Sequence, residues 1–279
     1  MAFCDLHTHS YYSDGTCLPS QLISQARQLQ LSAVALCDHN TVAGLPEFVA
    51  AASEGPVEAV PGVELSTQYE KTELHILGLF IRPEKYAEVT ALMAPLLLEK
   101  EQSNRSLVDK LNDIGFALDY DKIKAAAAGN VNRAVIGAEM TRLGYVPSIK
   151  DAFKEYLNES KGFYRPPRRL DAYDAIRFIK SIGAVAVLAH PFLSLDETGL
   201  RKFLPRAVQA GLDAMEVYYS KFSPEQTALA EQIAKKYGLL PSGGSDYHGD
   251  NKPDIFLGVG RGDLRVPGDF PEALRLRKG

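Results

Sequence analysis

The chain has 279 residues, which is enough for one large α/β domain or for one domain with a smaller insertion. Hydrophobic residues make up 46% of it, and the formal net charge of −4 argues against non-specific binding of nucleic acid. The three cysteines form no CxxC pair, so a disulfide framework or a cysteine zinc site is not expected. The sequence shows no signal peptide and no apolar run long enough to cross a bilayer, which predicts a cytoplasmic protein without a membrane partner.

Short apolar runs alternate with helical patterns in both flanks of the chain. Helices are expected at 18–31 and 45–53, and further helical patterns flank the later strands. The alternation predicts a mainly parallel sheet, open or closed as a barrel, with both faces covered. Cys4 and Cys37 are expected to be small buried side chains at strand ends. The expected strands are 3–7, 33–37, 57–65, 73–80, 184–189, 214–219 and 239–242.

The middle of the chain differs, because residues 83–157 show helical patterns alone. Gly115, Gly129 and Gly144 punctuate these patterns as helix ends or turns. A helical block between two stretches of strand–helix repeats predicts an inserted small domain. We therefore expect a metal-binding barrel from residues 1–98 and 166–279, and a helical insertion, or cap, from 99–165. The expected helices of the insertion are 96–114, 120–128, 133–143 and 148–157.

All six histidines are placed at or just after the ends of expected strands. In parallel α/β folds, the carboxyl ends of strands are where chemistry is assembled. His7 and His9 are two residues apart in an extended segment, so both imidazoles can reach one metal ion. A single histidine is more often structural, but the full set with its neighbouring acids predicts a metal centre. The histidines are His7, His9, His39, His75, His190 and His248, and the acids are Asp14, Glu64 and Asp246.

Six short segments, in this order, resemble the PHP (polymerase and histidinol phosphatase) superfamily of metal-dependent phosphoesterases: HTHSYYSDGT, CDHNT, GVEL, ELHILG, AHP and GSDYHG. The insertion, with Asn132-Arg133 and the segment 161–164, resembles the branch that acts on AMP and on 3′,5′-nucleoside bisphosphates. The resemblance implies a distorted (β/α)7 TIM-like barrel that binds two or three divalent ions, as manganese, iron or zinc. It implies a first metal on His7, His9, Glu64 and Asp246, a second on Glu64, His75 and His190, and a third on Asp14, His39 and His248.

One position departs from the family pattern. Relatives often carry TDHD where this chain has 37–40 as Cys-Asp-His-Asn, and Asn40 cannot supply a negative charge. If that acid tunes the third site, its replacement affects occupancy of that site. We expect Asp38 either to accept a hydrogen bond from a ligand histidine or to cap the next helix.

We expect the protein to hydrolyse a phosphate monoester of a small nucleotide by attack of a metal-bound hydroxide, because metal ions acidify bound water and neutralise phosphoryl oxygens. Arg133 is the candidate phosphate clamp, with a solvated helix residue as the alternative, and Lys161 and Glu216 are further candidate substrate contacts. Asp246 or His248 is expected to move a proton to the leaving group.

Three other functions stay open. The first is a histidinol-phosphate phosphatase, which the helical insertion disfavours because a cap suits a larger substrate. The second is a 5′-3′ exonuclease on short RNA or DNA ends, and the third is a metal-binding interaction module without activity. The expected partner is a small phosphorylated substrate, and no obligate protein partner is evident in the sequence.

Overall fold

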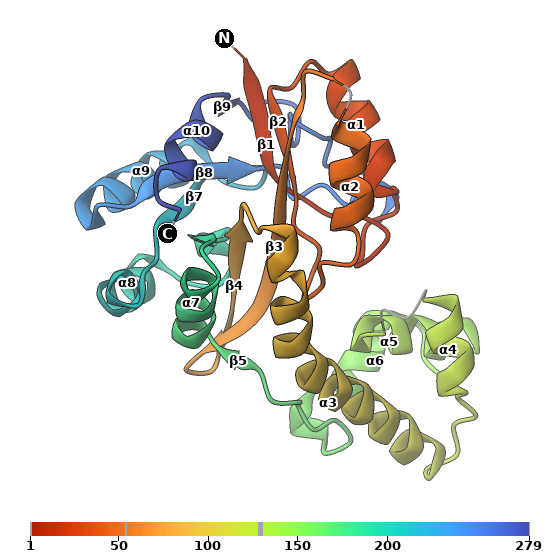
Figure 1. Cartoon of the computed structure of the whole chain (residues 1–279). Helices are drawn as coiled ribbons and strands as arrows, with labels where there is room; N and C mark the ends of the chain where they lie inside the picture. The colour runs from red at the N-terminus through yellow and green to blue at the C-terminus, as the bar shows by residue number, and fades with distance from the viewer. Residues whose placement is uncertain (1, 54, 128–130, 279) are drawn as a thin grey trace. The chain divides into compact units, whose positions relative to one another are not determined.

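The computed structural model describes residues 2–53, 55–127 and 131–278, so the turn expected at Gly129 lies outside the described residues (Figure 1). The chain divides into two compact units. The first, called the barrel unit below, comprises Met1–Ala91 and Leu170–Gly279, and the second, called the helical unit, comprises Leu92–Arg169. The boundary expected at residue 98 falls inside one continuous helix, α3 (Tyr86–Asn112).

Seven strands form the wall of the barrel unit. In the order of their hydrogen bonding they run β8, β7, β6, β4, β3, β2 and β1. The strand β4 is antiparallel to both of its neighbours, and the other pairs in this order are parallel, which gives the barrel its distortion. The strands are β1 (Phe3–Thr8), β2 (Ala33–Leu36), β3 (Glu58–Tyr69), β4 (Thr72–Leu79), β6 (Val185–Leu188), β7 (Ala214–Tyr219) and β8 (Leu240–Gly244).

The ring closes where the chain leaving β8 meets β1. The amide of Asp246 donates to the carbonyl of His7 at 2.8 Å, and the amide of His9 donates to the carbonyl of Tyr247 at 2.9 Å. Glycine is needed at position 244, since a Cβ there would lie 2.4 Å from the Cβ of His7. The expected distorted (β/α)7 barrel is therefore confirmed.

Helices cover the outside of the barrel wall. Helices α1 and α2 pack on each other beside β2 and β3, α7 packs on β3 and β4, and α9 packs on β7 (Figure 1). Two short strands missed by the sequence are β5 (Leu170–Asp171), paired with β3, and β9 (Val266–Pro267), paired with β1. The helices are α1 (Pro19–Gln28), α2 (Leu45–Ala52), α7 (Ala172–Ser181), α8 (Glu197–Ala210), α9 (Pro224–Tyr237) and α10 (Phe270–Arg275), with short 3₁₀ turns η1 (Pro83–Lys85), η4 (Pro191–Leu193) and η5 (Gly249–Asn251).

The strands are buried on both faces, as their continuous apolar runs predict. All four residues of β2 and all four of β6 are buried. Cys4 and Cys37 are free thiols in the core inside the barrel, as expected, where they pack with Val60, Leu77 and Val187. Burying aliphatic side chains at about 25 cal/mol per Å² stabilises this wall and holds the strand ends in fixed positions.

The helical unit has its own core, formed by residues such as Leu107, Leu111, Ile136 and Met140. Helix α3 begins ten residues before the expected start at 96, because Pro95 is accommodated inside it rather than starting it. Within the described residues, no helix of either unit is long and apolar enough to span a bilayer. The other helices are α4 (Tyr120–Ala126), α5 (Arg133–Arg142), α6 (Ile149–Ala152), the π turn η2 (Phe153–Leu157) and the 3₁₀ turn η3 (Glu159–Lys161).

Candidate metal centre

The barrel unit brings together all nine residues expected to hold metal. Most of them lie at or beyond the carboxyl end of a parallel strand, as the sequence predicts. His75 lies instead within β4, three residues after the strand begins, and pairs with Ser66 of β3. Because β4 runs antiparallel to its neighbours, the beginning of this strand lies at the same end of the barrel as the carboxyl ends of the others.

Glu64 lies at the centre of the cluster and is fully buried. Its Oε2 lies 3.2 Å from Nε2 of His7, 3.2 Å from Nε2 of His9 and 3.1 Å from Nδ1 of His39. Its Oε1 lies 2.7 Å from Nδ1 of His75 and 3.0 Å from Nε2 of His190. One carboxylate that faces imidazoles with both oxygens can bridge two cations.

The donor atoms form four overlapping groups, and within each group they all lie within 4.8 Å of one another. Among the described residues, Glu64 Oε2, His39 Nδ1 and His190 Nδ1 are buried without a hydrogen-bond partner. Buried polar atoms are almost always satisfied by hydrogen bonds. Glu64 Oε2 and His39 Nδ1, which face each other in the cluster without one, therefore fit a site for divalent ions. The groups are His7, His9 and Asp246; His7, Glu64 and His190; His39, Glu64 and His75; and His9, Asp14, His39 and His248.

The carboxylates of the cluster are held in their ionised form. Burial alone would raise the pKa of Glu64, but the neighbouring imidazoles of His39, His75 and His7 hold it well below its usual range. The same balance holds the pKa of Asp246 well below its usual value, with a hydrogen bond from His9 as the main lowering cause. The proposal that Asp246 or His248 moves a proton to the leaving group remains a prediction.

The histidines respond to this charge in different ways. Burial opposes protonation of His9 and His75, yet the neighbouring carboxylates raise the pKa of His9 to about 9 and of His75 to about 10. Burial lowers the pKa of His39 to about 3, and it also lowers the pKa of His248. His39 and His248 are therefore neutral at pH 7, which is the form that ligates metal.

Glu216 has a different position from the one expected for a substrate contact. It is fully buried, His7 donates from Nδ1 to its Oε1 at 3.0 Å, and the amide of His190 donates to its Oε2 at 2.6 Å. Both carboxylate oxygens are thus used inside the protein. Through the bond to Nδ1, Glu216 orients His7 so that its Nε2 faces Glu64. Substrate binding by Glu216 remains a prediction.

Asp38 fits neither of its two expected roles. Its Oδ1 accepts from the amide of Ser10 at 2.8 Å and from the hydroxyl of Ser13 at 2.6 Å, and its Oδ2 accepts from the hydroxyl of Ser10. Asp38 therefore fixes the loop that runs from His9 to Asp14, through contacts some 25 residues away in sequence that local patterns do not show.

Asn40 joins the segment that carries His39 to the strand that carries Glu64. It has a left-handed backbone with φ of 58°, a conformation that asparagine tolerates well. Its Oδ1 accepts from the amide of Ser66 at 2.9 Å, and its Nδ2 donates to the hydroxyl of Ser66 at 3.0 Å. These two hydrogen bonds give Asn40 a structural use at this position.

Two further residues that position the centre were not found from the sequence. Asp5 is fully buried and accepts from the amide and hydroxyl of Ser245 and from the amide of Gly258, which ties β1 to the segment before Asp246. Asp246 also accepts at Oδ2 from the hydroxyl of Tyr219 at 2.8 Å. The sequence around Asp5 and Tyr219 gives only a weak indication of these roles, since an acid or a tyrosine near a strand end is common.

The two expected substrate contacts of the helical unit have the following surroundings. Arg133 begins α5, is half-buried, donates from Nη1 to the carbonyl of Leu157 at 3.2 Å and stacks over the ring of Tyr164 at 4.3 Å. Lys161 is exposed in η3. The proposals that Arg133 clamps phosphate and that Lys161 contacts substrate remain predictions.

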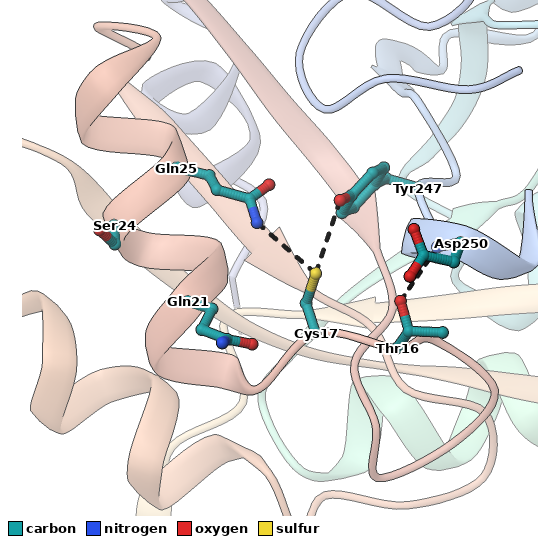
Figure 2. Close-up of a pocket in the computed structure, with 7 residues that line it drawn as sticks. All are labelled: Thr16, Cys17, Gln21, Ser24, Gln25, Tyr247 and Asp250. Atoms are coloured by element: carbon teal, nitrogen blue, oxygen red, sulfur yellow. Dashed lines mark hydrogen bonds between the residues drawn. The ribbon is translucent and has the colours of Figure 1, made fainter. Parts of the chain in front are cut away.

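A polar pocket of about 480 Å³ lies beside the segments that carry Asp14 and His248. Figure 2 shows Tyr247 and Gln25 turned towards the thiol of Cys17, and Asp250 paired with Thr16. The hydroxyl of Tyr247 faces the thiol of Cys17 just before helix α1, whereas the residues on either side of Tyr247 reach the donor cluster. The residues that line the pocket include one acid and no lysine or arginine, so this pocket is not built for a phosphate.

The sequence model of the PHP domain family matches residues 5–164. The chain belongs to the PHP family and is an enzyme of the metal-dependent phosphoesterase kind. It is 35% identical to a 5′-3′ exoribonuclease of Haemophilus influenzae over 246 residues, which cover 88% of this chain and 89% of the relative.

Two other relatives support the same family. The chain is 29% identical to a 3′,5′-nucleoside bisphosphate phosphatase of Chromobacterium violaceum over 251 residues, which cover 89% of this chain and 88% of the relative. A crystal structure from Bifidobacterium adolescentis, described as a metal-dependent phosphoesterase, superposes with a TM-score of 0.81 at 27% identity and covers 100% of this chain and 97% of that one.

Proposed function

We propose that the protein hydrolyses a phosphate ester of a small nucleotide, with a 3′,5′-nucleoside bisphosphate as the first candidate substrate. The observation that carries the proposal is the position of Glu64, which faces five imidazoles inside the barrel mouth. A cluster of this composition is suited to a centre of two or three divalent ions, with manganese, iron and zinc as the candidates.

We assign the nine donors as the family resemblance implies. His7, His9, Glu64 and Asp246 hold a first ion, Glu64 with His75 and His190 holds a second, and Asp14 with His39 and His248 holds a third. When bound, such ions supply a Lewis acid for the phosphoryl oxygens and an acidified water as nucleophile. The protein's own residues orient these donors: Glu216 aligns His7, and Asp38 fixes the loop of Asp14.

A second candidate is 5′-3′ hydrolysis of short RNA ends. The relative that carries this name is 35% identical over most of both chains, which supports the candidate. The two substrates are chemically related, because a 3′,5′-bisphosphate presents the same two phosphates as the first nucleotide of a 5′-phosphorylated RNA. One site can therefore serve both, and the length of the 3′ extension that it admits distinguishes them.

The test is a hydrolysis assay with purified protein whose metal content has been measured by elemental analysis. The substrates are adenosine 3′,5′-bisphosphate, AMP, histidinol phosphate, and a 5′-phosphorylated RNA trimer beside the same trimer with a 5′-hydroxyl. We expect fastest release of phosphate from the bisphosphate and slower cleavage of the phosphorylated trimer. Preference for histidinol phosphate, or no hydrolysis of any nucleotide by the metal-loaded protein, would contradict the proposal.

A further inference from the structure

Lys252 places a positive charge next to the donor cluster. It follows η5, and its backbone is fixed by hydrogen bonds from its amide to the carbonyl of Gly249 and from the amide of Ile255 to its own carbonyl. Its Nζ donates to Oδ2 of Asp246 at 2.7 Å. The side chain of Asp246 is 8% exposed and that of Lys252 is 29% exposed, so the ammonium stands between the buried cluster and solvent.

The two oxygens of Asp246 have different partners. Oδ1 faces the cluster, 3.3 Å from Nε2 of His9 and 3.4 Å from Nδ1 of His248. Oδ2 accepts from Lys252 and from the hydroxyl of Tyr219. The ammonium is thus separated from the proposed metal site by the width of a single carboxylate.

An ammonium at this position is unfavourable for metal binding by itself. Like charges a few ångströms apart repel, and the hydrogen bond to Asp246 withdraws electron density from a metal ligand. Tyr219 already donates to the same oxygen, so Lys252 is not needed to satisfy Oδ2. The position of the Lys252 ammonium becomes favourable when an anion is bound at the metal centre, because the positive charge then attracts the anion.

We propose that Lys252 is a substrate-binding residue that donates to the phosphoryl group of the substrate. An ammonium has three N–H donors, and the bond to Asp246 uses one of them. That bond holds the flexible side chain in place before substrate arrives, so less conformational entropy is lost on binding. The inference rests on the proposed phosphoesterase function and extends it, since it names a phosphate contact within the barrel unit itself.

The test compares Lys252→Met, which keeps the length of the side chain without its charge, with Lys252→Arg. Lys221→Met is the matched control, since Lys221 is an exposed lysine two residues after Tyr219. Binding of orthophosphate to the Mn²⁺-loaded proteins is measured by calorimetry, Mn²⁺ affinity is measured separately, and KM is measured with the bisphosphate. Thermal unfolding confirms that each variant is folded.

We expect Lys252→Met to weaken orthophosphate binding by about 10-fold or more and to raise KM, as loss of a charge-assisted hydrogen bond does. Its Mn²⁺ affinity should be equal to or tighter than that of the unchanged protein, because a repulsive charge is gone. Lys252→Arg should recover part of the phosphate affinity, and Lys221→Met should behave as the unchanged protein.

Two results would overturn the inference. Unchanged orthophosphate affinity in Lys252→Met would show that the ammonium does not reach the phosphoryl group. Weaker Mn²⁺ binding together with weaker phosphate binding would make Lys252 a positioning residue for Asp246 instead. Failure of the proposed function is a separate result, in which the unchanged metal-loaded protein neither binds orthophosphate nor hydrolyses nucleotides.

Discussion

Glu216 on β7 accepts a hydrogen bond from Nδ1 of His7 on β1 at 3.0 Å, although the two residues are 209 positions apart in the chain. This bond fixes the tautomer of His7 and directs its Nε2 to the centre of the cluster, 3.2 Å from Glu64. The same glutamate holds the amide of His190. It therefore couples two proposed ligands without being one itself.

Replacing Glu216 by alanine should lower metal affinity by about 10- to 100-fold, because partners of this kind have effects of that size. Glu216→Gln should have an intermediate effect, since its single carbonyl oxygen can serve His7 or His190 but not both. Metal titration with a fluorescent chelator as competitor measures the change. Equal affinity in all three proteins would show that the bond does not matter for binding.

Replacing Glu64 by glutamine keeps the shape of the side chain but removes the charge that faces five imidazoles. We expect hydrolysis to fall by at least about 100-fold and bound metal to decrease, as also expected for His9→Ala. Elemental analysis and turnover are the measurements, and circular dichroism reports on the fold. Normal turnover in either variant would refute the assigned cluster.

Replacing Asp38 by alanine removes the acceptor that holds Ser10 and Ser13. The loop should become mobile, with a loss of stability of about 1–3 kcal/mol from unsatisfied donors. Because Asp14 is next to Ser13, the third metal should be lost before the others. Stepwise metal titration checks this, and a loss of all ions at once would instead show that the sites are not separable.

Arg133→Ala should raise KM or lower kcat for phosphorylated substrates without removing metal, if Arg133 clamps phosphate. Arg133→Lys is the matched variant, since it keeps the charge but loses the bidentate geometry and the stacking on Tyr164. Steady-state kinetics with parallel elemental analysis distinguish the two effects. A fall in metal content would show that the role assigned to Arg133 is wrong.

The metal-free protein should lose stability as the pH rises. The pKa values of His9 and His75, about 9 and about 10, lie above the ordinary value of 6.5, so their pairing with carboxylates stabilises the fold fully below pH 6.5. This contribution falls as the pH rises above 6.5 and is fully lost once the pH has passed 9 to 10. Thermal unfolding in a chelator should show a falling midpoint across that window. With metal present the added stabilisation should grow with pH, since metal competes with protons.

Local sequence patterns were enough to predict the residues of the cluster and the class of fold. Imidazoles and carboxylates at the ends of apolar strands can be recognised as candidate metal ligands from the sequence, because a parallel barrel brings those strand ends to one mouth. His7 and His9 show this best, since alternation along one extended strand turns both to the same side. The domain boundary expected at residue 98 has no comparable marker in the sequence, because helix α3 runs through this position without a break.

Only the tertiary structure decided which residues support the cluster. Three residues, Glu216, Asp38 and Asn40, each hold a partner on another segment. Their roles depend on long-range hydrogen bonds that form only when the segments of the barrel come together. The direction of β4 was also decided by the tertiary structure, since its antiparallel pairing with β3 and β6 places His75 at the mouth of the barrel. Residue type and spacing determine which ligands a side chain can bind, whereas the pairing of segments distant in sequence determines which residues it contacts.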